Sequence, residues 1–193
     1  MRAFGKGSIA EIIRIGLLIG WAVLWVCMAT ILAISIAFAL HSAGIVDMGK
    51  FFAPDNGIRL NFGEDEISLP AGAPTWPLFI SAILVGAVVV GGGLMIVWRL
   101  RRLVESFCSG QPFAKPNATH LRAIWMTMVG IEVARYALLL LTIAALTGFG
   151  ATQDADLKLK IDLSTWGSIL ILIVLAEVFR EGARLKEEQE LTI

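Results

Sequence analysis

Cysteine, histidine and charged residues are all scarce in this sequence. Its 193 residues include two cysteines and two histidines, and only 17 % are charged, whereas a soluble domain carries about 25 % charged residues. Lys plus Arg equals Asp plus Glu at 16 each, so the excess positive charge of a nucleic-acid-binding domain is missing. The composition therefore excludes an ordinary cytosolic enzyme, a disordered tail, a disulfide scaffold and direct binding of nucleic acid.

Catalytic sequence motifs are missing as well. The chain contains no HExxH, GxSxG, CxxC or phosphate-binding glycine loop. Cys108 has no neighbouring histidine that would act as its base, because His120 follows 12 residues later. Cys27 lies in an apolar stretch and is interpreted as a small apolar residue. We therefore expect a protein that is not an enzyme and that uses no cofactor and no metal.

Apolar residues, in contrast, make up 57 % of the chain. Each of four apolar segments reaches the roughly 20 residues that a membrane-spanning helix needs. These segments cover about residues 12–40, 76–98, 121–148 and 163–184. The sequence thus predicts one membrane domain over residues 1–193, with an all-α, four-helix transmembrane bundle. A cleaved signal peptide is the alternative for the first segment, but its apolar run is longer than signal sequences have.

Lysine and arginine are distributed unevenly around these spans. Eleven of the 16 lie in the N-terminal arm, in and beside the loop 99–120, and toward the C-terminal tail 185–193. Four lie in the loops 41–75 and 149–162, and one, Arg135, lies within a span. Because cytoplasmic segments carry the excess of Lys and Arg, we expect both termini and the loop 99–120 in the cytoplasm. His41 and His120 would then lie on opposite sides and could not share a metal ion.

The two loops expected outside show alternating polarity. Ile58, Leu60 and Phe62 alternate with polar residues, and an acidic Gly-containing segment, residues 63–66, separates them from a second short alternating run. Residues 157–163 alternate in the same way, so the sequence predicts a β-hairpin or three-stranded cap on the outer face. The lysines of the third run would lie near the acidic segment. That segment is interpreted as a solvated turn, with a cation site as the alternative.

Two pairs of opposite charges fall within the apolar spans. Glu132 and Arg135 are three residues apart near the middle of the third span, and Glu177 and Arg180 repeat this spacing near the end of the fourth. Residues at this spacing lie on one helix face and can neutralise each other, as charges in a membrane require. The predicted polar cluster of these four residues serves as a proton or ion relay, or it only fixes the register of the helices. Gly91-Gly92-Gly93 is the one candidate for a broken span, with close helix packing as the alternative.

The spans are expected to extend as helices into the cytoplasm. The second span should continue as an amphipathic helix to about residue 107, and Asn117 is a plausible N-cap for the third span. The last span continues into residues whose charges are spaced for pairs three and four apart. This charged end is either a solvated helix terminus or a tail that docks a cytoplasmic partner.

Two motifs on that side resemble a bacterial family of small four-span membrane proteins, a domain of unknown function. They are Gly110-Gln-Pro-Phe113 with Asn117 and Leu121-Arg122-x-Ile124, and Ala176-Glu-Val-Phe-Arg-Glu-Gly182 with Leu185-Lys-Glu-Glu188. The resemblance implies a place in the bacterial inner membrane and a partner, since members are often encoded beside a small Xre/Cro-like helix-turn-helix regulator. It implies no catalytic residue. The candidate docking residues are Gln111, Pro112, Phe113, Asn117, Arg122, Arg184, Glu187 and Glu188.

The sequence leads to two hypotheses of function. The first is a non-enzymatic inner-membrane sensor or tether that holds a small cytoplasmic transcription regulator. The second is a small transporter or channel subunit that uses the intramembrane Glu/Arg cluster, and a structural subunit of a larger complex is a weaker third. Gly16-x-x-x-Gly20 in the first span permits a homodimer in the lipid bilayer.

Overall fold

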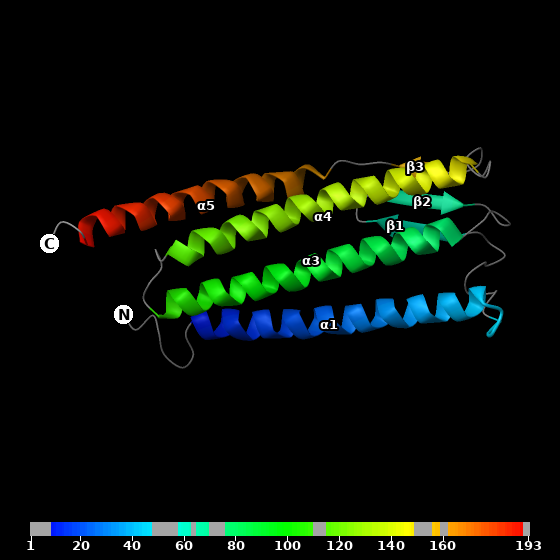
Figure 1. Ribbon diagram of the computed structural model, residues 1–193, viewed down its shortest axis with the longest axis horizontal. Coiled ribbons are helices and arrows are strands. Elements are labelled where there is room, and N and C mark those ends of the chain that lie inside the picture. Colours follow the sequence, from blue (N-terminus) through cyan, green and yellow to red (C-terminus); the bar gives the residue numbers. More distant parts are fainter. Residues whose placement is uncertain are drawn as a thin grey trace. The chain divides into compact units, whose positions relative to one another are not determined.

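Four long helices make up most of the protein. The computed structural model describes residues 9–47, 58–62, 65–69, 76–109, 115–148, 156–158 and 162–190. The helices are α1 (Ile9–Ser42), α3 (Trp76–Cys108), α4 (Lys115–Gly148) and α5 (Leu163–Glu190) (Figure 1). Each is long and apolar enough to cross a membrane, and each contains one of the four spans predicted from the sequence. Helix α3 runs unbroken through Gly91-Gly92-Gly93, so these glycines do not interrupt a span.

A small antiparallel sheet accompanies the helices. Its strands are β1 (Ile58–Phe62), β2 (Asp65–Leu69) and β3 (Asp156–Lys158), in the order β1-β2-β3. The register of β1 on β2 pairs Phe62 with Asp65, which leaves two residues between the strands. The register of β2 on β3 pairs Glu66 with Lys158.

This arrangement corrects the fold class predicted from the sequence. The all-α bundle with a cap on its outer face is wrong as a fold class, and we describe the protein as four long helices with a short sheet. Asp65 and Glu66, which we expected in the turn, are the first residues of β2, because pairing continues to the end of β1. The third strand is shorter than predicted, since β3 ends at Lys158 and Leu163 already begins α5. The strand ends predicted from the alternating polarity were therefore wrong.

The chain folds into two compact units. Unit 1 contains residues 1–26, 91–130 and 163–193, and unit 2 contains residues 27–90 and 131–162. The core of unit 1 is a cluster from three helices, with Leu103 of α3, Leu121 and Ile124 of α4, and Ala176 of α5 buried together. Phe107 and Phe179 stack beside it with ring centroids 5.7 Å apart. This cluster joins the ends of α3 and α4 to the middle of α5.

Helices α1 and α3 touch at points spaced seven residues apart. In unit 1, a Cβ on Gly93 would lie 3.2 Å from Cδ2 of Leu24. In unit 2, a Cβ on Gly86 would lie 3.1 Å from Cδ1 of Ile31, and the rings of Phe38 and Phe79 stack at 5.8 Å. From one contact to the next, the residue numbers rise along α1 and fall along α3, so the two helices run antiparallel. The glycines of α3 allow this close approach, as small residues do between membrane helices.

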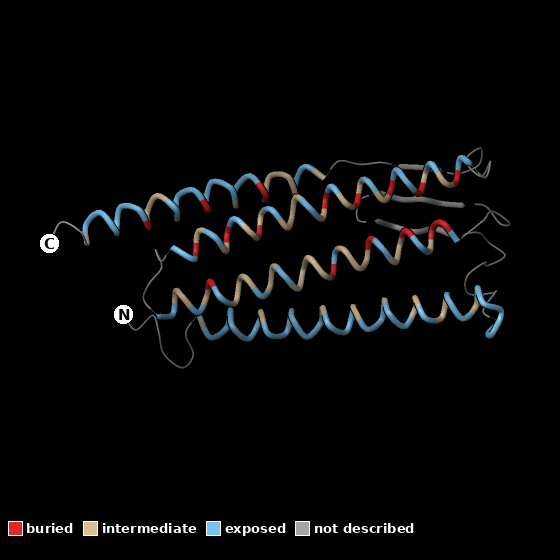
Figure 2. Tube along the Cα trace, viewed as in Figure 1, coloured by how far each residue is buried: buried red, intermediate tan, exposed pale blue. Residues whose placement is uncertain are grey.

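Burial follows a narrow stripe on α4, whereas α1 is exposed along most of its length (Figure 2). The buried stripe recurs every three or four residues and includes Asn117, Leu121, Ile124, Leu139, Thr142 and Leu146. Large apolar side chains cover the opposite sides of the helices; Leu141 of α4, for example, is 66 % exposed. Helices that are apolar on their outer as well as their inner sides suit an apolar surrounding.

The contact between Gly93 and Leu24 leads to a first prediction. Gly93→Leu should separate α1 from α3 and lower the free energy of unfolding in detergent by about 1–3 kcal/mol, the usual effect of overpacking. Gly91→Leu is the matched control on the same helix, because no described atom beyond its own stretch of α3 lies within 4 Å of the position that a Cβ on Gly91 would take. Equal stability of the two variants in a thermal or denaturant titration would contradict the close contact.

Candidate functional site

A buried pair of opposite charges lies on α4 in unit 2. Nη2 of Arg135 donates a hydrogen bond to Oε2 of Glu132 at 2.9 Å, and both residues are less than a tenth exposed, at 7 % and 8 %. The three-residue spacing places both on the buried stripe of the helix. The guanidinium also lies 4.8 Å from the centroid of the Tyr136 ring. Two buried positions of α4 are thus occupied by charged residues whose opposite charges neutralise each other.

The surroundings of this pair contain further buried polar groups. The hydroxyl of Tyr136 is buried and has no hydrogen-bond partner among the described residues. Thr142, two turns along the same stripe, donates from its hydroxyl to the carbonyl of Leu138 at 2.7 Å. A buried hydroxyl without a partner is costly, and its position next to an ion pair gives α4 a polar patch in an otherwise apolar segment.

The second predicted pair has a different environment. Glu177 and Arg180 of α5 also form an ion pair, but their side chains are 59 % and 70 % exposed. They belong to unit 1, whereas Glu132 and Arg135 belong to unit 2. The structure forms each predicted pair within one helix, Glu132 with Arg135 on α4 and Glu177 with Arg180 on α5. Only the pair on α4 is buried, because only it lies on the buried face of its helix.

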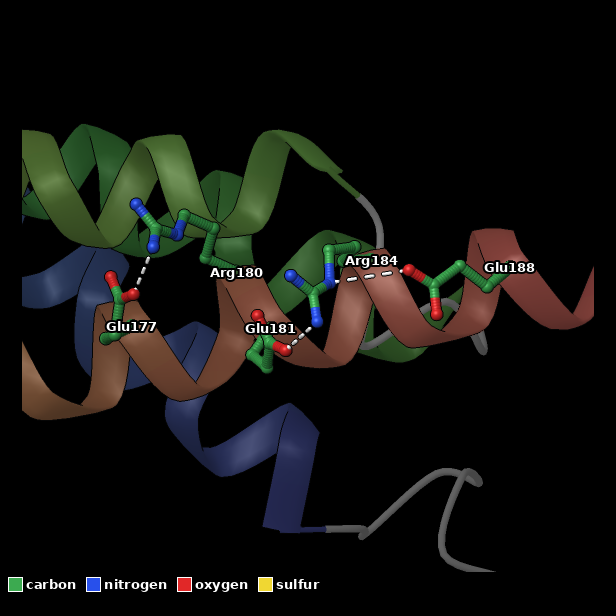
Figure 3. Close-up of polar contacts among 5 residues, drawn as sticks. All are labelled: Glu177, Arg180, Glu181, Arg184 and Glu188. Atoms are coloured by element: carbon green, nitrogen blue, oxygen red, sulfur yellow. Dashed lines mark hydrogen bonds and ion pairs between the residues drawn. The ribbon is translucent and has the colours of Figure 1, made fainter.

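The charged end of α5 carries a chain of ion pairs (Figure 3). Arg184 lies 2.6 Å from Glu181 and 3.5 Å from Glu188, one turn on either side. We call these three residues the tail ladder. Lys115, at the beginning of α4, lies 2.6 Å from Glu187 and ties the two helices together. The charges of α5 therefore hold this end as a helix as far as Glu190.

The candidate docking residues separate into three groups. Arg122, Arg184, Glu187 and Glu188 are exposed. Asn117 is only 1 % exposed, and its Nδ2 donates to Oγ of Ser106 at 2.9 Å, so it connects α4 to α3 and is not available to a partner. It is not an N-cap either, because α4 begins at Lys115. Gln111, Pro112 and Phe113 lie outside the described residues.

Sequence reasoning missed two contacts between helices in unit 1. Nη1 of Arg99 on α3 donates to Nδ1 of His120 on α4 at 3.1 Å. A groove between α4 and α5 is lined by basic residues from both helices, among them Lys115, Arg122 and Arg180. No spacing along the chain indicates either feature, because the residues are far apart in sequence. Within the described ranges, no three His, Cys, Asp or Glu residues gather as a metal site.

Four helices that are each long and apolar enough to span a membrane are consistent with a multi-pass membrane protein. The chain belongs to the family described as "Protein of unknown function (DUF2975)", whose model matches residues 63–193, about two thirds of the sequence. The match covers α3, α4 and α5 but not α1. No curated protein and no solved structure matches the chain. The match confirms a family of unknown function, which is one part of what the resemblance implied, and it assigns no activity.

The two ion pairs allow a direct comparison of buried and exposed charges. Glu132→Leu should lower the free energy of unfolding by about 3–5 kcal/mol, because it leaves the guanidinium of Arg135 buried without its carboxylate. Glu177→Leu removes a carboxylate from an exposed pair with the same spacing and should cost at most about 1 kcal/mol. Unfolding titrations in detergent measure both. A similar loss in the two variants would show that burial does not distinguish the pairs.

Proposed function

We propose that this protein is a non-enzymatic inner-membrane tether for a small cytoplasmic transcription regulator of the helix-turn-helix class. In this proposal both termini and the segment between α3 and α4 face the cytoplasm of a bacterial cell. The distribution of Lys and Arg supports the orientation. The resemblance to a family whose members are often encoded beside such a regulator supports the partner.

The tail ladder is the observation that carries the proposal. Helix α5 continues for 14 residues beyond Ala176 of the core cluster, and within this stretch Phe179 still packs against that cluster and Ala183 is buried. Over this length it presents exposed charges of both signs in a fixed order, held by pairs one turn apart. A rigid helix with alternating charges offers a partner an oriented surface at little entropic cost. The same residues belong to the part of the chain that matches the family.

Deleting residues 181–193 should abolish binding of the regulator, and Arg184→Glu should weaken it by about tenfold or more. The reversal removes the central charge of the tail ladder and repels both flanking carboxylates. The tagged chain is first purified from its native host in mild detergent, and a small helix-turn-helix protein present in near-equal amount is identified. That protein is then titrated against the wild type and the variants.

Arg14→Glu is the control for this titration. Arg14 is an exposed arginine of α1 outside the part of the chain that matches the family, and its reversal should leave binding unchanged. Full binding by the chain without residues 181–193 would refute the tail as the docking surface. Equal losses with Arg14→Glu and Arg184→Glu would indicate attraction by net charge alone.

The buried pair on α4 favours a second candidate, a small transporter or channel subunit. Glu132 and Arg135 lie in a helix apolar enough to span a membrane, and the guanidinium of Arg135 lies over the ring of Tyr136, whose buried hydroxyl has no hydrogen-bond partner in the described part of the chain. Ionisable groups within a span are often parts of an ion or proton path. In this reading, the carboxylate of Glu132 takes and releases a proton while Arg135 holds it in place.

Glu132→Gln tests this second candidate. The amide keeps the size of the side chain and one acceptor oxygen but carries no exchangeable charge, so proton flux should fall to the level of empty vesicles. Flux is followed with a pH-sensitive dye inside vesicles that contain equal amounts of folded wild type or variant. Glu177→Gln, in the exposed pair, should leave flux unchanged. A fully active Glu132→Gln variant would refute the relay.

A further inference from the structure

A groove of about 390 Å³ lies between α4 and α5 within unit 1. From α4 it is lined by Lys115, Arg122 and Trp125, and from α5 by Ile173, Glu177 and Arg180. The two helices run antiparallel here, since the start of α4 is tied to the end of α5 by the pair of Lys115 with Glu187. The basic lining therefore comes from the polar ends of two apolar helices that meet side by side.

The charges of the groove leave one cation without a counter-ion. Lys115 is paired with Glu187, and Arg180 is paired with Glu177. Arg122 is exposed, and the structure gives it no ion pair or hydrogen bond with any described residue. The three cations and two carboxylates thus leave a single positive charge. A ligand that carries one negative charge would neutralise this remaining positive charge.

Polarity changes along the groove in the direction of the helices. Lys115 and Trp125 are ten residues apart, which is about 15 Å along α4. Lys115 lines one end of the groove, and Trp125 and Ile173 line the part farther along the helices, together with Glu177. Beyond these residues both helices continue with apolar outer sides. Tryptophan at such a boundary is typical of the level at which lipid headgroups meet acyl chains.

We propose that this groove binds the headgroup of an anionic phospholipid, with the phosphodiester on Arg122 and the start of the acyl chains against Trp125 and Ile173. A phosphodiester carries one negative charge and oxygen acceptors that a guanidinium binds in a bidentate manner. Arg180, whose Nη2 donates to Oε1 of Glu177, also lines this groove. The proposal requires the helices to lie in a membrane, but it does not require the regulator.

The test uses the full chain in a neutral detergent, titrated with a short-chain phosphatidylglycerol and followed by calorimetry. The wild type should bind one lipid per chain, and phosphatidylcholine of the same chain length should bind at least about tenfold more weakly because it has no net charge. Arg122→Gln should weaken phosphatidylglycerol binding by about tenfold or more, the usual effect of losing a charge-assisted hydrogen bond. Arg122→Lys should restore part of it, since the charge stays but the bidentate geometry is lost.

Arg184→Gln is the matched control, because it removes the same charge from an exposed arginine of α5 that does not line the groove. It should bind phosphatidylglycerol as the wild type does, whereas it weakens the tail ladder. Equal losses in Arg122→Gln and Arg184→Gln would overturn the proposal in favour of unspecific attraction. Displacement of the lipid by millimolar inorganic phosphate would overturn it in favour of a soluble phosphate ligand. Wild-type affinity in a folded Arg122→Gln variant would show that the groove does not hold the headgroup.

Discussion

The apolar outer side of the helices is the constraint on which the rest of this structure depends. Where the outside of a helix is as apolar as its inside, burial of apolar area cannot decide which face packs inward. The face that packs inward is then determined by the shapes of the side chains and by the positions of polar groups. Gly86 and Gly93 admit α1 against α3, and Asn117 bonds to Ser106 between α3 and α4. The pair of Glu132 and Arg135 takes its place in the same way, on the one face of α4 that is buried.

The helices could be predicted because the rule behind them is one of length and charge alone. A run of about 20 uncharged apolar residues is a span wherever it packs, and all four predicted spans lie inside observed helices. The packing faces could not be predicted for the reason just given. The ends of the strands were misjudged because acidic residues suggest a turn, whereas Asp65 and Glu66 are held in β2 by pairing with β1 and β3.

In the candidate site, too, contacts within one helix could be predicted from the sequence, whereas contacts between helices could not. Pairs three residues apart on one helix follow from helix geometry, and both expected pairs form. Whether such a pair is buried depends on the neighbouring helices, so the sequence could not distinguish Glu132 from Glu177. Nor could it indicate that Asn117 is interior, or that Lys115, Trp125 and Arg180 line one groove. The first fact depends on the contact between α3 and α4, and the second on the antiparallel packing of α4 and α5.

The arginines of unit 1 differ in how many carboxylates they are paired with. This difference distinguishes the surface proposed for the regulator from the groove proposed for the lipid. Arg184 is held between two carboxylates, so a partner that docks on the tail ladder meets a fixed pattern of charges with no net pull on a small anion. Arg122 has no such counter-ion among the described residues, and it lies where the polar and apolar parts of α4 meet. In the lipid proposal, the guanidinium of Arg122 attracts a phosphate whose acyl chains enter the surrounding bilayer. The two proposals therefore use different residues of the same helix pair, Arg184 for the protein partner and Arg122 for the lipid, and do not compete with each other.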